Sequence, residues 1–139
     1  MKTGVSEVDD SIVGLEQSLL QNFDQSEGLP VEMYFIKGVC VRALYIPCGM
    51  ILTGRIHNHE CVNIVAKGKI AVASNEGNRT LEEGAIFVSP PGVKRAGFAL
   101  KDTIYVTVHR TDTVDPEALI DELTSGSFEE YTKRIEGGI

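Results

Sequence analysis

Apolar and polar residues alternate in short runs along the middle of this chain, and turn residues separate the runs. Alternation with a period of two is typical of β-strands, because successive side chains of a strand point to opposite faces of the sheet. Glycine and proline mark the breaks, as in Pro47-Cys48-Gly49 and Pro90-Pro91-Gly92. The pattern predicts eight strands, over Glu32–Ile36, Val39–Ile46, Ile51–His57, Val62–Ala66, Lys69–Ser74, Ala85–Ser89, Lys94–Ala99 and Thr103–Arg110. Strands of this number and spacing indicate an all-β sandwich or jelly roll.

The two ends of the chain have a helical period instead. Residues 10–23 place four apolar side chains at helical spacing, with Asp10 or Ser11 as the cap: Ile12, Leu15, Leu19 and Phe23. Later, Asp115-Pro116 is a cap followed by proline at the first helical position, which predicts a helix over Glu117–Thr124. A second amphipathic segment covers Phe128–Ile135. We therefore expect an N-terminal helical extension (1–30), a barrel (31–112) and a C-terminal helical segment (113–139).

Size and charge exclude several classes of partner. The 139 residues suit one domain with a proper core, and the net charge of −7 opposes binding to a nucleic-acid backbone. No apolar run approaches the ~20 residues that span a bilayer, and the first ten residues lack the features of a signal peptide. Cys40, Cys48 and Cys61 are an odd number at no metal-site spacing, so we interpret them as free thiols in a reducing cytosol. These features predict a cytoplasmic protein without nucleic-acid or membrane partners.

The stretch His57-Asn58-His59-Glu60 carries the first candidate chemistry. If the strand continues through it, His57 and His59 share one face, and Glu60 stands at the following bend. Two imidazoles with a carboxylate in reach suit a divalent transition metal. They also suit a polar ligand bound without a metal, or a plain pair of solvent-facing histidines near a turn.

A second stretch, 25 residues further on, reads Gly84-Ala-Ile-Phe-Val-Ser-Pro-Pro-Gly-Val-Lys-Arg95. It resembles the second signature of the cupin superfamily, Gly-x5-Pro-x-Gly-x2-His, at every position but the last. The first signature, Gly-x5-His-x-His-x3,4-Glu-x6-Gly, is matched more loosely, through His57, His59 and Gly68. The resemblance implies an all-β, cupin-type double-stranded β-helix (jelly roll) with short N- and C-terminal helices.

More narrowly, the chain resembles small cupin-type proteins of tailed phages. The stretches that carry this resemblance are Thr53-Gly-Arg-Ile-His57, Gly92-Val-Lys-Arg95 and Asp102-Thr-Ile-Tyr-Val-Thr-Val-His109. That family supplies a fold but no settled function. If the protein is phage-encoded, its location is the host cytoplasm.

The resemblance leaves two kinds of site open. Metal-binding cupins use two histidines, a glutamate and a further histidine, which here implies His57, His59 and Glu60 as metal ligands. The further histidine position holds Arg95, a permanent cation that ligates no metal. If Arg95 and Arg55 point inward, the cavity favours carboxylates or phosphates. If they do not, Arg95 is exposed or pairs with Glu60. His109 shares a strand face with Tyr105 and Thr107, and is either a further ligand or a strand-end histidine bonded locally.

We predict a protein that binds a small polar or anionic molecule in its barrel, through Arg55, His57, His59, Arg95 and His109. One alternative is a metal-dependent cupin enzyme, as an isomerase, hydrolase or oxygenase. Another is a structural or accessory phage protein with the barrel as a scaffold. Small cupins commonly cover their edge strands by dimerising, so we expect a homodimer or small homo-oligomer. The predicted surface is the early strands (32–46) and the N-terminal helix.

Overall fold

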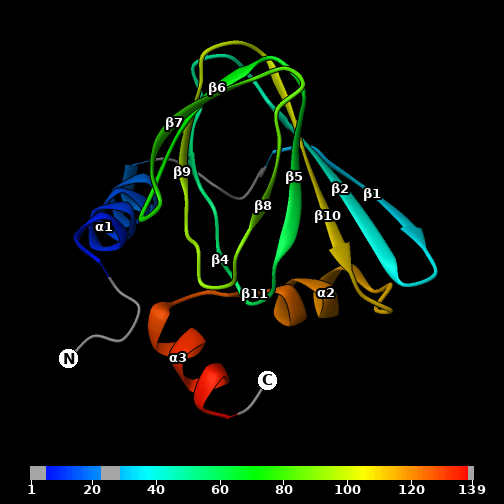
Figure 1. The fold of residues 1–139 in the computed structure, drawn as a ribbon. Helices are drawn as coiled ribbons and strands as arrows, with labels where there is room; N and C mark the ends of the chain where they lie inside the picture. Colours follow the sequence, from blue (N-terminus) through cyan, green and yellow to red (C-terminus); the bar gives the residue numbers. More distant parts are fainter. Residues whose placement is uncertain (1–5, 23–28, 138–139) are drawn as a thin grey trace.

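A computed structural model describes residues 6–22 and 29–137, with side chains given for all of these except residues 18–22. Two antiparallel sheets face each other and form a barrel (Figure 1). Sheet A has the order β1 (Val31–Ile36), β2 (Val39–Ile46), β10 (Thr103–Arg110), β5 (Cys61–Lys67) and β8 (Ile86–Ser89). Sheet B has the order β3 (Ile51–Thr53), β9 (Ala96–Ala99), β6 (Lys69–Ser74) and β7 (Gly77–Glu82).

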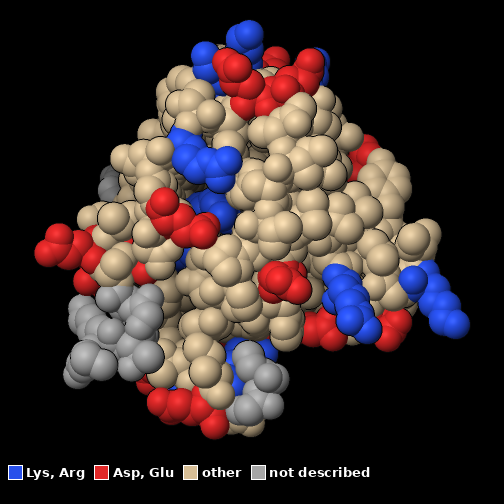
Figure 2. All heavy atoms as spheres, in the orientation of Figure 1, with Lys and Arg blue, Asp and Glu red and all other residues tan. Residues whose placement is uncertain are grey.

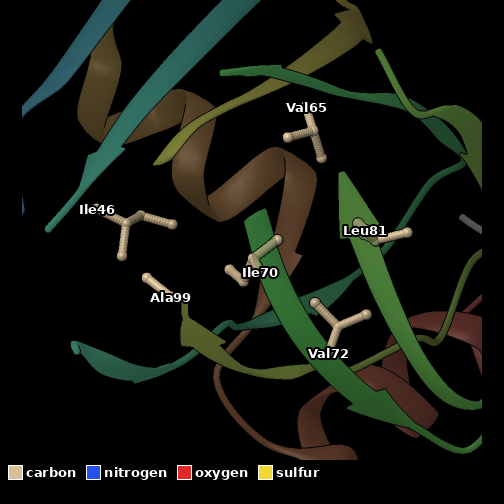
Figure 3. Packing of buried hydrophobic residues seen from close by; sticks show 6 residues of the cluster. All are labelled: Ile46, Val65, Ile70, Val72, Leu81 and Ala99. Atoms are coloured by element: carbon tan, nitrogen blue, oxygen red, sulfur yellow. The ribbon is translucent and has the colours of Figure 1, made fainter. Parts of the chain in front are cut away.

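One half of the barrel interior is apolar. Six buried side chains from both sheets form its core, as Figure 3 shows: Ile46, Val65, Ile70, Val72, Leu81 and Ala99. Leu44, Phe87 and Tyr105 pack at the border of this cluster. Each core residue lies on an inward-facing strand position, so the alternation in the sequence translates directly into a packed core.

The other half of the interior is closed from below by the C-terminal segment. The short strand β11 (Thr124–Ser125) pairs with β4 (Ile56–His57). Helix α2 (Pro116–Leu123) buries Leu119 and Leu123 against Cys40, and Met33 and Phe35 pack on the same cluster. Helix α3 (Phe128–Glu136) follows, with Ser127 as its cap. Strand β11 and helix α2 therefore close the lower end of the barrel, and α3 lies below them (Figure 1).

Asn58 fixes this closure. Its backbone N–H donates to the Leu123 carbonyl oxygen over 2.8 Å, and its side-chain amide donates to the Glu122 carbonyl oxygen over 3.1 Å. The amide oxygen accepts a hydrogen bond of 2.6 Å from the Ser125 hydroxyl. Asn58 is only 4% exposed, so these bonds are made in a nearly dry environment.

Helix α1 (Glu7–Asn22) packs outside the barrel beside sheet B (Figure 1). Lys94, which is 1% exposed, joins the helix to the barrel. Its ammonium group donates to the Gly54 carbonyl oxygen over 2.8 Å and to both Glu16 carboxylate oxygens over 3.1 and 3.2 Å. Thr53 donates to the same carboxylate over 2.8 Å. This ion pair ties the position of α1 to the loop before β9 (Ala96–Ala99), which carries Arg95.

The predicted all-β jelly roll with terminal helices is confirmed, and most predicted strands are present. The strand predicted over Ile51–His57 is wrong in one respect, because it breaks at Gly54, whose N–H bonds to the Arg95 carbonyl oxygen, and resumes as β4. Strand β7 was not predicted, since its sequence is polar and only Leu81 is buried. The cap of α1 is also earlier than predicted, because Ser6 and Asp9 bond reciprocally. Of the predicted helical stripe, the Leu19 side chain and Phe23 lie outside the described residues.

Among the described residues, no helix is long and apolar enough to cross a membrane.

The Asn58 closure generates a stability prediction. Replacing Asn58 by Ala leaves the buried Ser125 hydroxyl and the Glu122 carbonyl without their partner, which costs roughly 2 kcal/mol of unfolding free energy. The control is Asn75→Ala at an exposed turn, where a change within about 0.5 kcal/mol is expected. Urea unfolding of both variants measures the difference. Equal stabilities of Asn58→Ala and wild type would show that the closure is held by α2 packing alone.

Candidate functional site

The polar half of the interior lies on sheet A, and strand register fixes its layout. Thr107 of β10 stands opposite Arg42 of β2 on one side and Asn63 of β5 on the other. One level nearer α2, His109 stands opposite Cys40, and Cys61 stands opposite Ser89. Inward positions of a barrel usually carry apolar side chains, so this concentration of polar groups is unusual.

Arg95 points into this layer from the loop before β9. Its Nη1 donates to the Ser89 hydroxyl over 2.7 Å, and its Nη2 forms an ion pair of 3.1 Å with Glu76. The guanidinium carbon lies 5.4 Å from the centre of the Phe87 ring. Arg79 of β7 also faces Phe87, at 4.6 Å. Two guanidinium groups therefore meet one aromatic ring at the rim of the polar layer.

Arg42 lies deeper than these two. Its Nε is buried and has no hydrogen-bond partner among the described residues, and none of the described carboxylates forms an ion pair with it. Burial lowers the pKa of its guanidinium group, because the charged form loses hydration. A charged donor that is buried without an acceptor is costly, and native proteins rarely retain one without a use.

His57 and His109 lie near Arg42, with ring centres 6.3 Å apart in an edge-to-face arrangement. Burial lowers the pKa of His57 to about 4, and the positive charges of Arg95 and Arg42 act in the same direction. Burial likewise lowers the pKa of His109 to about 4, with smaller contributions from His57 and Arg42. Both rings are therefore neutral at pH 7 and offer one donor and one acceptor each. His109 Nε2 uses one of these with Thr107 Oγ1, at 2.8 Å.

Hydroxyl, amide and thiol groups complete the layer. Tyr105 donates to the Asn63 amide oxygen over 2.9 Å, and the Asn63 amide nitrogen donates to Ser89 over 2.6 Å. Burial raises the pKa of Tyr105 to about 12, so its hydroxyl stays a donor. The Cys61 thiol lies 3.4 Å from His57 Nδ1, and burial raises the pKa of this thiol. A continuous series of hydrogen bonds thus runs from Tyr105 through Asn63 and Ser89 to Arg95, and it holds these side chains in fixed orientations.

The structure does not bring all of the predicted site residues together. His57, His109 and Arg95 lie in the interior layer. Arg55 is exposed and bonds to Thr124 over 2.7 Å. His59 and Glu60 are exposed in the bend after β4, because that strand ends at His57. The prediction that His57 and His59 share a strand face is therefore wrong, and so is the alternative pairing of Arg95 with Glu60, since Arg95 pairs with Glu76.

Sequence reasoning missed several residues of the layer, namely Arg42, Asn63, Arg79, Ser89 and, as a member of the network, Tyr105. For Arg42 a signal existed, because it is the one charged residue in the apolar strand Val39–Ile46 and occupies the same alternation class as Cys40 and Leu44. Asn63 interrupts an apolar strand in the same way. A polar residue within an otherwise apolar strand indicates a binding site, provided that the strand face on which it lies is known to point into the barrel.

A divalent metal does not fit the residues present. The described residues contain no group of three or more His, Cys, Asp or Glu side chains placed to hold a metal ion. His59 and Glu60 stand outside the interior, and the permanent cations Arg95 and Arg42 act on the His57 ring. A dication placed there would be repelled by both guanidinium groups. The donor set is thus better suited to an anion.

A hollow outside the barrel contains none of the predicted ligand residues. It has a volume of about 460 Å³ and lies on the outer face of sheet B beside α1, with mainly small and apolar lining, including Leu15, Ile51, Ala71, Ala73 and Phe98. Arg79, which faces Phe87 at the rim of the polar layer, also contributes to its lining, together with Asn78 and Thr80.

The two facing sheets and the closed polar end define an all-β jelly roll of the cupin type. No protein-family model matches the chain, and no curated protein matches it. Among solved structures, it is similar to KdgF from Halomonas sp., with 17% identity over 68% of this chain and 88% of that one and a TM-score of 0.55. An RmlC-like cupin from Shewanella frigidimarina matches with 19% identity over 64% and 89%, at a TM-score of 0.50.

A larger protein shares the same fold. A mutant of salicylate 1,2-dioxygenase from Pseudoaminobacter salicylatoxidans matches 85% of this chain and 35% of its own, with 16% identity and a TM-score of 0.56. At these identities the likeness shows the fold alone.

The two histidines of the polar layer predict a pH dependence of stability. Below their ordinary pKa of 6.5 the unfolded chain takes up protons that the folded protein binds only near pH 4. Their contribution is therefore complete above pH 6.5 and is lost as the pH falls toward 4, by on the order of 3 kcal/mol each at most. Urea unfolding across this range should show a weaker loss for His109→Gln. The exposed control His59→Gln should behave as wild type, and an equal pH dependence in all three proteins would contradict the assignment.

The poor fit to metal predicts that no divalent transition metal survives dialysis at one equivalent per chain. Elemental analysis of protein purified without chelator measures this. Arg95→His, which restores the histidine of the signature and removes one cation, should raise the bound metal. A full equivalent of iron, manganese, nickel or zinc in the wild type would show that the interior rearranges to bind it.

Proposed function

We propose that this cupin-fold protein binds a small anionic molecule in the polar layer of its barrel. The observation that carries the proposal is the Arg42 guanidinium group, which is buried at its Nε with no acceptor among the described residues. An anion at this place supplies the missing acceptor and the missing countercharge. Removing water from a charge-assisted hydrogen bond also strengthens it.

The charge balance of the layer supports the same ligand class. Arg42, Arg79 and Arg95 contribute three permanent positive charges, and Glu76 is the carboxylate that pairs with one of them. The neutral rings of His57 and His109 add hydrogen-bonding capacity without adding charge. The layer is thus positive inside a chain whose net charge is −7. A carboxylate or phosphate group matches the planar donor fork of each arginine.

Glu76 gives the site an internal competitor. Its carboxylate is half exposed and occupies Arg95 Nη2, while Arg95 Nη1 is held by Ser89. A bound anion replaces Glu76 at this guanidinium group, and the exposed carboxylate returns to water at small cost. We therefore assign Arg42 and Arg95 to anion binding. The ion pair between Glu76 and Arg95 belongs to the ligand-free protein.

The alternatives predicted from the sequence have less support. No described cluster of three metal-binding side chains favours a metal-dependent enzyme. A phage origin, and a role as an accessory phage protein, rest on the sequence resemblance alone.

Binding of carboxylates, sugar phosphates and nucleotides tests the proposal. Thermal shift identifies an anion that stabilises the wild type, and titration calorimetry then measures its affinity for each variant. Arg95→Ala and Arg42→Met should each weaken binding by roughly 1.5–3 kcal/mol, which is ~10- to 150-fold. Arg95→Lys should recover only part of this loss, because an ammonium group lacks the planar fork.

Two further variants separate binding from general effects. Glu76→Gln removes the competitor and should tighten binding roughly two- to fivefold. Arg110→Ala, at an exposed position at the end of β10, is the matched control and should leave affinity unchanged. Arg42→Met should not lower the stability of the ligand-free protein, since it removes an unpaired buried charge. If no anion stabilises the wild type, or if all variants bind it equally, the proposal is wrong.

A further inference from the structure

The outer face of sheet A is more apolar than its inner face. Register places Val88, Val62, Val108, Val41 and Tyr34 in one row that crosses all five strands. The next row contains Ile86, Ile64, Val106, Ala43 and Glu32. Since side chains alternate between faces, both rows point away from the polar layer around Arg42 and Thr107. This reverses the usual arrangement, in which the outer face of a sheet is polar.

Much of this face is open in the single chain. Ile86 is 68% exposed and Val88 60% at one edge of the sheet, and Tyr34 is 55% exposed and Ile36 73% at the other. Helix α1 lies on the other sheet, and α2 and α3 lie at the lower end of the barrel (Figure 1). A contiguous apolar surface of this kind marks an interaction site, because monomeric proteins rarely leave one in water.

Charge indicates which partner covers the face. Its paired rows carry charged residues only near their ends, at Glu32, Lys67 and Arg110. Figure 2 shows the surface over β5 and β8 largely free of charged side chains, with charged groups around its margin. The chain as a whole carries a net charge of −7, so two copies repel each other over most of their surface. Two acidic copies therefore repel each other least when they approach through this uncharged face.

The area of the face also fits a dimer. The five strands have 6, 8, 8, 7 and 4 residues, which at about 3.4 Å per residue and about 4.8 Å between strands give a face of roughly 540 Å². A standard stable interface buries about 800 Å² per partner. Side chains protrude from the sheet and the edge strands expose their sides, so the accessible area of the face is larger than this flat estimate. The area of the face is therefore close to the lower end of stable interfaces, which is about 600 Å² per partner.

We infer that two copies of this chain associate face to face through the outer surface of sheet A. The two sheets pack as in a β-sandwich, and the central valines and isoleucines of β5 and β10 become the interface core. The two-fold arrangement buries the same rows on both copies. Of the surface predicted from the sequence, β1 and β2 belong to this interface and α1 does not. This inference is independent of the anion site, because the two lie on opposite faces of the sheet.

Sedimentation velocity and light scattering test the inference, with the full chain at micromolar concentration. The wild type should have about twice the 15.1 kDa mass of one chain. Ile86→Glu places a carboxylate on the β8 edge of the face, and Val88→Glu does the same two residues later. Each should weaken the dimer by at least roughly 100-fold, because a desolvated unpaired charge is costly. Both positions are exposed, so the single chain should keep its circular dichroism spectrum.

The chain offers a matched control in Ile51→Glu. Ile51 is 45% exposed on β3, which is the edge strand of sheet B, so the same substitution is made on the other sheet. This variant should remain a dimer. A monomeric wild type overturns the inference, whatever else covers the face. A dimer that survives both Ile86→Glu and Val88→Glu, or one that Ile51→Glu dissociates equally well, overturns it too.

Discussion

The guanidinium group of Arg42 inside the barrel is the constraint on which the rest of the polar layer depends. Strand β2 is paired on both sides, so the backbone leaves Arg42 no freedom to turn outward. Its charge helps to keep His57 and His109 neutral. Thr107 on the neighbouring strand β10, and Asn63 on β5 beyond it, are level with Arg42 and are polar as well. These polar neighbours leave the Arg42 Nε without an acceptor among the described residues, so they do not by themselves satisfy this cation.

Most of the fold was predictable, because the period of two in the chain directly reports strand faces. The eight predicted strands and the jelly roll follow from this pattern and from the glycine and proline breaks. What alternation does not report is the pairing partner of each strand, so β7, whose polar sequence forms an edge, was not predicted. The pairing of β11 with β4 was missed for the same reason. Both depend on contacts between residues that are distant in the sequence.

The candidate site was predictable only in part. His57, His109 and Arg95 were found because their residue types carry chemistry and because two motifs resembled known signatures. His59 was placed with His57 by assuming a strand that continues, but the bonds of Asn58 to residues 122–125 end the strand at His57. Arg42 was overlooked, although its position in an apolar strand was visible. The inward face of β2 could not be identified until its partners β1 and β10 were known.

The polar inner face and the apolar outer face of sheet A are explained by the same energetic requirement, which is the burial of enough apolar surface. Polar side chains on the inner face reduce the apolar surface that the barrel buries within itself, and they separate the six-residue core from the smaller cluster around Cys40 and α2. At about 25 cal/mol per Å² of buried apolar surface, this is a substantial loss for a single domain of this size. The apolar rows on the outer face replace the lost burial if a second copy covers them. A barrel that keeps a charged, polar interior for a ligand thus has a physical reason to associate through its outside. The same strands, β2, β5 and β10, serve both purposes, because alternation gives each strand two independent faces.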